Sequence, residues 1–208
     1  MLRLKRIGPR SLVLCAGKRI YFRILARRYR FSNWHASAPY ECRPYKAEVV
    51  ALANTVDPAV VLEIGCGLGE IISRVNCDSR YGVDLDAAVL EGARFLHGNA
   101  CRFAVGSLSD GDALFQFVRG RVDLLILVNW PHRLSWPDLS SAVEKVIHGL
   151  GARYVLIDGI RPEVTGYANY HGRTRFEAWG EIACEKISSD GARVLYLVRC
   201  GNGPGRVE

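Results

Sequence analysis

The sequence predicts an α/β protein with a mostly parallel sheet, helices on both of its faces and an antiparallel pair of strands at the end of the chain. Three observations support this fold class. From residue 44 to residue 157, short apolar runs typical of buried strands alternate with segments of helical periodicity. This alternation then stops, because the strand-like runs 181–187 and 194–199 are joined by Ser188-Ser189-Asp190-Gly191, which is typical of a hairpin turn. The chain is also 49% hydrophobic over 208 residues, which is enough for one substantial core.

The individual elements follow in order from local signals. Pro44 suits the first turn of a helix, and Asp57-Pro58 ends that segment. Besides the hairpin, the expected strands are residues 60–64, 81–84, 102–105, 122–128 and 154–157. The expected helices are residues 44–53, 70–75, 87–95, 111–118 and 137–150. The longest apolar run, 122–128, is far shorter than the ~18 residues that cross a bilayer, so the pattern excludes a transmembrane protein.

Positive charge is concentrated at the start of the chain. Residues 1–40 hold ten of the 28 basic residues and no acidic one, although the whole chain has a formal charge of +7. Apolar and basic side chains alternate there at roughly helical spacing, so a helix would have one apolar and one cationic face; they are Ile20, Tyr21, Ile24, Leu25 and Phe31, with Arg19, Arg23, Arg27 and Arg28. Such an arm could pack on the main domain, lie on an anionic lipid surface or contact phosphates of a nucleic acid. An organelle transit peptide has a similar composition.

These patterns divide the chain into a basic N-terminal arm and flap, residues 1–43, a main domain, residues 44–200, and a flexible tail, residues 201–208. Seven cysteines without a C-x-x-C pair fit neither a disulfide framework nor a zinc ribbon. We therefore expect a reducing, cytoplasmic compartment, with peripheral contact at the inner membrane surface as a further alternative. No cluster has the spacing of metal ligands, so no metal is expected.

The strongest chemical signal is the segment 63–69, Glu-Ile-Gly-Cys-Gly-Leu-Gly, directly after the first predicted strand. Glycines at such a turn let the backbone approach a ligand closely, and a following helix would add the positive end of its dipole. The spacing differs from the G-x-G-x-x-G of dinucleotide sites. Asp84 ends the next strand, where a carboxylate can accept both hydroxyls of a ribose. Together the two features predict a nucleoside ligand other than a dinucleotide.

On these residues the chain resembles the class I S-adenosylmethionine-dependent methyltransferases over residues 44–200, including the C-terminal hairpin. The resemblance implies a Rossmann-like sheet of seven strands and S-adenosylmethionine as cofactor. By position it places Glu63, Gly65, Gly67 and Gly69 at the methionine side of the cofactor and Asp84 at the ribose. Ser107 and Leu108 fall where the family contacts adenine, although many members have Asp in place of Ser107. The flap residues 31–45, with Trp34, His35 and Tyr45, lie where the family often covers the cofactor.

The acceptor side is less clearly marked. Asn129-Trp130-Pro131-His132 follows the fourth strand and only partly matches the [Asp/Asn]-Pro-Pro-aromatic motif of amino-methyltransferases. Asn129 could bind an amino acceptor, or His132 could remove a hydroxyl proton as a general base. His171, in the long connection 158–179, is the rival base.

The sequence therefore predicts a small methyltransferase that acts on oxygen or nitrogen of a small polar or glycan acceptor. One alternative is a nucleic-acid amino-methyltransferase, which the partial motif and the positive charge favour. Another is a non-catalytic protein that uses the fold to bind the cofactor as a scaffold.

Overall fold

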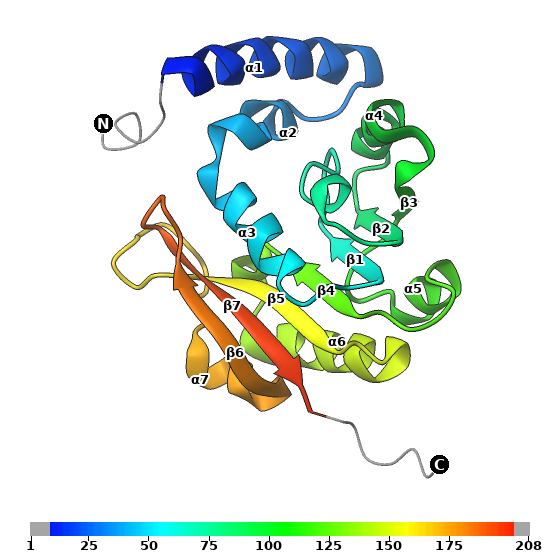
Figure 1. Ribbon diagram of the computed structural model, residues 1–208, viewed down its shortest axis with the longest axis vertical. Coiled ribbons are helices and arrows are strands. Elements are labelled where there is room, and N and C mark those ends of the chain that lie inside the picture. The colour runs from blue at the N-terminus through cyan, green and yellow to red at the C-terminus, as the bar shows by residue number, and fades with distance from the viewer. Residues whose placement is uncertain (1–8, 202–208) are drawn as a thin grey trace.

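The computed structural model describes residues 9–201, with side chains from Leu12 onward, and its centre is a seven-stranded sheet (Figure 1). The strands are β1 (Val60–Ile64), β2 (Ser79–Asp84), β3 (Arg102–Val105), β4 (Leu124–Leu127), β5 (Tyr154–Ile160), β6 (Gly180–Ile187) and β7 (Arg193–Cys200). Their order is β3-β2-β1-β4-β5-β7-β6, parallel from β3 to β5 and antiparallel on both sides of β7. This confirms the predicted fold class and the terminal hairpin.

Helices cover both faces of the sheet. The longer ones are α1 (Pro9–Tyr29), α2 (Asn33–Ser37), α3 (Pro44–Asn54), α4 (Ala87–His97), α5 (Gly111–Phe117), α6 (Trp136–Leu150) and α7 (Arg173–Phe176). Short 3-10 turns are η2 (Tyr40–Cys42), η3 (Ile72–Arg74), η4 (Gly98–Ala100), η5 (Pro131–Arg133) and η6 (Glu177–Trp179). One apolar core joins α1, α3 and α4 to the sheet, and the other joins α5, α6 and η6 to the opposite face. No helix within residues 9–201 is long and apolar enough to cross a membrane.

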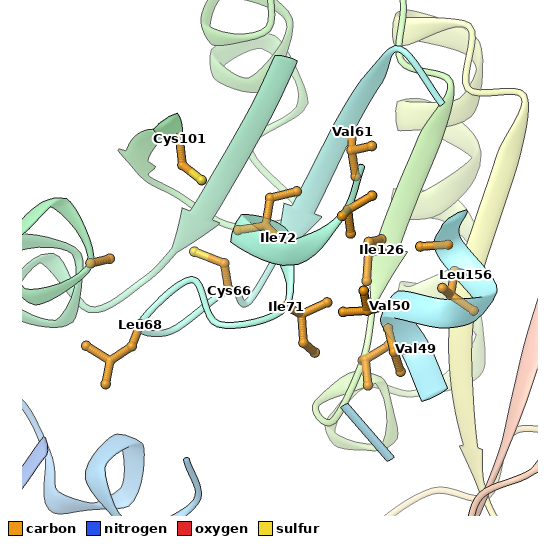
Figure 2. Close-up of a cluster of buried hydrophobic side chains, with 14 of the residues drawn as sticks. Val49, Val50, Val61, Cys66, Leu68, Ile71, Ile72, Cys101, Ile126 and Leu156 are labelled. Atoms are coloured by element: carbon orange, nitrogen blue, oxygen red, sulfur yellow. The ribbon is translucent and has the colours of Figure 1, made fainter. Parts of the chain in front are cut away.

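The core on the α3 face reaches the segment that follows β1. Figure 2 shows side chains from α3, from the central strands and from this segment in one cluster; they include Val49, Val50, Val61, Leu68, Ile71, Ile72 and Ile126. Ile72 and Val61 are fully buried. Because these apolar contacts hold both ends of the turn after β1, its backbone is placed firmly at the carboxyl edge of the sheet.

The expectation of a helix at residues 70–75 is wrong. This segment is a series of turns that contains only η3. The carboxylate of Glu63 accepts a hydrogen bond from the backbone N–H of Ile72, at 2.9 Å between Oε2 and N, and the backbone N–H of Ser79 already bonds to Ala59. With so few residues between these two attachments, the chain returns to the sheet before a helix can form. The turn after β1 therefore carries no helix dipole.

The expectation that cysteines form no disulfide is also wrong. Cys15 of α1 and Cys42 of η2 are bonded, with their Cα atoms 5.1 Å apart, while the other five cysteines are free. The bond was missed because the two residues lie 27 positions apart and show no spacing motif. Its consequence is that α1 is tied covalently to the flap, and its inner face, with Phe22 and Leu25, belongs to the core.

Two predicted segments lie partly outside the described residues. Arg3, Lys5 and Arg6 of the basic arm precede residue 9, and the predicted tail is described only at Gly201. The side chain of Arg10 is likewise outside the described part.

Candidate active site

A cavity of about 560 Å³ lies where β1, β2 and β4 end. This is the edge at which ligands bind in open parallel sheets, because the strand ends and the following loops meet there. Its lining comes from four places: the turn after β1, the end of β2, the loop after β3 and the end of β4. The flap from α2 to α3 completes the wall. The site thus brings together segments that are widely separated in the chain.

The turn after β1 begins with a left-handed glycine loop, defined here as residues 65–69. Gly65, Gly67 and Gly69 all have positive φ, at 75°, 54° and 71°. The backbone N–H groups of Gly65 and Cys66 donate to the carbonyl of Val83, which fixes the loop against β2. A Cβ at Gly65 would overlap the indole of Trp130, and one at Gly67 would lie 3.1 Å from Nδ1 of His35. Glycine is therefore required both by the backbone conformation and by the close neighbours.

Glu63, in β1, holds the chain just after the glycine loop. It is buried, and its carboxylate holds the backbone of Ile72, as described above. Burial raises the pKa of Glu63 to about 8, although the hydrogen bond from Ile72 acts in the opposite direction. Glu63 also borders the cavity, so it lies at the place where the resemblance puts the methionine end of the cofactor.

Asp84 links the glycine loop to the start of α4. Its Oδ2 accepts from the backbone N–H of Gly67 at 2.8 Å, and its Oδ1 accepts from that of Asp86 at 3.0 Å. The carboxylate is buried and lines the cavity. Since each carboxylate oxygen has two acceptor positions, each can still accept one more hydrogen bond. Asp84 can therefore hold the loop and bind two hydroxyls together.

The loop after β3 forms another wall. Ser107 donates both its backbone N–H and its hydroxyl to Oδ2 of Asp110, at 2.8 and 2.9 Å. Its hydroxyl hydrogen is therefore already used inside the loop. Leu108 is buried and presents an apolar surface beside it. This wall suits a flat apolar group, with contacts from the backbone and from Leu108.

Asn129, directly after β4, has a strained backbone with φ at 77°. Its backbone N–H donates to Oδ1 of Asp158 at 2.9 Å, and its side-chain oxygen accepts from Nη1 of Arg193 at 3.3 Å. The same Nη1 donates to Oδ2 of Asp158 at 2.8 Å. Asp158 and Arg193 are only 2% and 3% exposed. This buried ion pair therefore holds Asn129 in its unusual conformation at the cavity wall.

Arg193 was not singled out in the sequence, although it holds Asn129. Its guanidinium lies 4.0 Å from the ring centre of Tyr45, a residue of α3 that also lines the cavity. Asp158 raises the pKa of Arg193 against the effect of burial, so the guanidinium stays charged. The sequence could not indicate this contact, because Arg193 begins the last strand and Asn129 lies 64 positions earlier in the chain.

Neither predicted histidine base lines the cavity. His171 is buried, with Nε2 at 3.0 Å from the carbonyl oxygen of Leu134 and Nδ1 at 3.0 Å from Nη1 of Arg175. Arg175 can only donate, so Nδ1 accepts and Nε2 donates, which leaves no free acceptor on His171. The expectation of a base at His171 therefore conflicts with this geometry, and the residue braces the long connection.

His132 is the other predicted base. Its ring meets that of Tyr167 edge to face, with centres 4.7 Å apart, and the buried Nδ1 has no hydrogen-bond partner within the described residues. Burial lowers the pKa of His132, so the imidazole is neutral near neutral pH. His132 lies outside the cavity lining, two residues after Trp130, whose indole N–H donates to the carbonyl of Ile64 at 2.6 Å.

The flap residues Trp34, His35 and Tyr45, which the resemblance placed over the cofactor, all line the cavity. His35 lines the cavity above Gly67, with Nε2 at 3.8 Å from Oδ2 of Asp86. Burial lowers the pKa of His35, while Asp84 and Asp86 act to raise it. Lys46 donates to Glu70 in the turn after β1, at 2.7 Å between Nζ and Oε2. This ion pair fastens the flap to the turn, and no local motif could have indicated it.

Comparisons with known proteins agree with this architecture. Neither a family model nor a curated protein matches the sequence. Magnesium protoporphyrin IX methyltransferase ChlM from Synechocystis PCC 6803, solved with bound SAH, has a TM-score of 0.60 and 13% identity, over 90% of this chain and 99% of that one. The N-methyltransferase NodS from Bradyrhizobium japonicum WM9, solved with S-adenosyl-L-homocysteine (SAH), has a TM-score of 0.62 and 16% identity, over 86% and 97%.

A third match is the methyltransferase domain of bacterial CtHen1, with a TM-score of 0.55 and 16% identity, over 76% of this chain and 97% of that one. At these identities the likeness concerns the fold. The chain has the fold of the class I S-adenosylmethionine-dependent methyltransferases.

Proposed function

We propose that this chain is an S-adenosylmethionine-dependent methyltransferase acting on an oxygen or nitrogen atom of a small polar or glycan acceptor. The observation that carries the proposal is one cavity lined by residues 65–68 of the glycine loop, by Asp84 and by Ser107 with Leu108. Gly69, also predicted at the cofactor, faces Phe103 and lies outside the lining. The solved proteins with this fold include complexes with SAH and with S-adenosylmethionine, which supports the same cofactor here.

The residues at the cavity fit this cofactor. The remaining acceptor positions of Asp84 suit the two ribose hydroxyls, and Leu108 offers an apolar surface to adenine. The glycine loop lets the backbone approach the methionine part, above Glu63. When bound, the cofactor supplies an electrophilic methyl group on a sulfonium, so the task of the protein is to align the acceptor lone pair with it.

Asn129 favours an oxygen acceptor. Arg193 can only donate, so it faces the side-chain oxygen of Asn129 and takes one of the two acceptor positions of that oxygen, while the amide NH₂ has no hydrogen-bond partner among the described residues and can donate to a ligand. An NH₂ group donates to an oxygen lone pair, whereas the amino group of a nucleobase needs an acceptor. This orientation supports the small polar or glycan acceptor over the nucleobase alternative.

Arg133 adds a charge to the same end of the cavity. It lines the wall beside Asn129 and is exposed, and its guanidinium forms no hydrogen bond or ion pair with the side chain or backbone of another described residue. A free guanidinium at the rim suits an acceptor that carries a carboxylate or phosphate. An acidic sugar or a sugar phosphate combines this anion with the hydroxyl that Asn129 would bind.

The assignment of His132 as the general base stays a prediction. His132 has a free buried Nδ1 but lies outside the cavity lining, so it would need to move to reach an acceptor. We therefore assign acceptor positioning to Asn129 and keep His132 as the candidate base for a hydroxyl.

The test has two stages. Calorimetry should first show SAH binding, and incubation of labelled S-adenosylmethionine with metabolite and glycan extracts should then label an acceptor. Absence of SAH binding would overturn the cofactor assignment. Binding of SAH without transfer to any acceptor would favour the scaffold alternative, and labelling of RNA or DNA alone would favour the nucleic-acid alternative.

The role of Asn129 is tested by Asn129→Gly, which removes the side chain and keeps the positive φ. Turnover should fall tenfold or more while SAH affinity changes by less than a few-fold. Asp57→Gly is the matched control, because Asp57 also has positive φ, at 44°, and is exposed. Normal turnover in Asn129→Gly would refute this role, and loss of turnover in His132→Ala alone would place the chemistry there.

A further inference from the structure

Helix α1 has two apolar faces, and only one of them is covered. Cys15, Phe22 and Ala26 are buried on its inner side. Val13, Ile20 and Ile24 have the same spacing of seven and four residues, shifted by two positions, which places them on the opposite side of the helix. Their exposed fractions are 74%, 61% and 57%. We call these three residues the outer stripe; Leu14 and Tyr21 are exposed beside it.

Arginines border the outer stripe. Arg19, Arg23 and Arg27 follow one another at i, i+4 and i+8 along one side, and Arg28 lies on the other side. All four are exposed, and none forms an ion pair within the described part of the chain. No acidic residue occurs before Glu41. The exposed surface of α1 is therefore an apolar stripe between cationic margins.

The position of α1 leaves this surface accessible. Figure 1 shows α1 along the edge of the molecule, with α2 and α4 on its inner side. The disulfide between Cys15 and Cys42 and the buried Phe22 hold the inner face against the domain. The helix cannot turn to hide the outer stripe without breaking these contacts, so the stripe remains directed outward.

We propose that the outer stripe and its arginines bind the surface of a bilayer that contains anionic lipids. Exposed isoleucines and a valine suit the boundary between headgroups and acyl chains, and guanidinium groups beside them suit lipid phosphates. A second copy of this chain is disfavoured, because pairing two such faces would bring their arginines together. A nucleic acid would pair with the arginines but would leave the apolar stripe in water.

Membrane binding would also orient the cavity. Helix α2 packs beside α1 and carries Trp34 and His35, which line the cavity, and Trp34 is itself 52% exposed. Docking through α1 would therefore hold the cavity close to the bilayer, within reach of an acceptor attached to a lipid. This last step rests on the proposed function, whereas the binding itself does not.

The test uses the full-length protein and sedimentation with vesicles. Vesicles of phosphatidylcholine alone are compared with vesicles that also contain about one-third phosphatidylglycerol, at low and high salt. The protein should bind the anionic vesicles, and salt should weaken the binding. Ile24→Glu should lower the partition coefficient about tenfold or more, because it places a charge in the stripe. Replacing Arg23 and Arg27 by Ala should lower the partition coefficient about twenty-five-fold, since each arginine near the surface contributes a factor of about five.

Ile187→Glu is the matched control, because Ile187 lies at the end of β6 and has the same exposed fraction as Ile24, 57%. It should bind vesicles like the wild type. The Tm and SAH affinity of each variant separate a folding defect, or a failure of the cofactor assignment, from loss of membrane binding. Equal binding of Ile24→Glu and Ile187→Glu, or no preference for anionic vesicles, would overturn the proposal. A dimer that Ile24→Glu disrupts, or RNA binding without vesicle binding, would overturn it as well.

Discussion

The contact between Gly65 and Trp130 offers a direct test of how the site is built. In Gly65→Ala the new methyl group meets the indole of Trp130, which cannot move freely because its N–H is bonded to the carbonyl of Ile64. The left-handed backbone adds strain for any residue with a Cβ. The substitution therefore disturbs the backbone, the packing and one hydrogen bond together.

The magnitude can be estimated from these three effects. A left-handed alanine costs about 1–2 kcal/mol, overpacking about 1–3 kcal/mol and the lost hydrogen bond about 0.5–1.5 kcal/mol. We expect Gly65→Ala to lower the free energy of unfolding by about 2.5–6.5 kcal/mol and, at roughly 2–4 °C per kcal/mol, the Tm by roughly 5–26 °C. Affinity for SAH should fall tenfold or more, because the loop must shift away from the cavity.

Gly151→Ala isolates the backbone contribution. Gly151 follows α6 in the left-handed region, with φ at 59° and ψ at 40°, and a Cβ there would meet only the flexible side chain of Arg121, at 3.4 Å or more. This variant should lose only about 1–2 kcal/mol and keep the SAH affinity of the wild type. Urea unfolding and calorimetry on both variants provide the comparison. Equal losses of stability in the two variants, with SAH affinity retained in Gly65→Ala, would refute the reasoning.

Two further predictions concern carboxylates of the site. Asp84→Ala removes acceptors for two ribose hydroxyls and for the backbone N–H of Gly67, so calorimetry should show at least about tenfold weaker SAH binding. Asp112→Ala is the control, because Asp112 is exposed and its loss should leave SAH affinity unchanged. An unchanged affinity in Asp84→Ala would exclude the ribose assignment. Burial raises the pKa of Glu63 from its ordinary 4.5 to about 8, so the folded state holds this proton more tightly than the unfolded state. The resulting stability is fully present below about pH 4.5 and is lost as the pH rises through about 8. Urea unfolding between pH 5 and 8 should therefore show that the free energy of unfolding falls more steeply with pH in the wild type than in Glu63→Gln. Parallel dependences on pH in the two proteins would contradict this effect of Glu63.

Local patterns predicted most of the fold. The periodicity of apolar residues depends on neighbours a few positions apart, and it located all seven strands and most of the helices close to their observed bounds. The exception was the expected helix at residues 70–75, where Glu63 and the nearby start of β2 leave room only for turns. A short segment can look helical alone and still be held otherwise by its two ends.

By itself, the sequence determined the α/β class, the strand that leads into the glycine loop, and Asp84 at the end of the next strand, because each depends on residues adjacent in the chain. Only the tertiary structure decided which side chains meet. It paired Cys15 with Cys42, placed Arg193 against Asn129 and occupied both nitrogens of His171. The outer stripe of α1 was likewise visible only once the inner face was seen to be covered. Contacts between distant residues depend on how whole elements pack, and no local spacing records that packing.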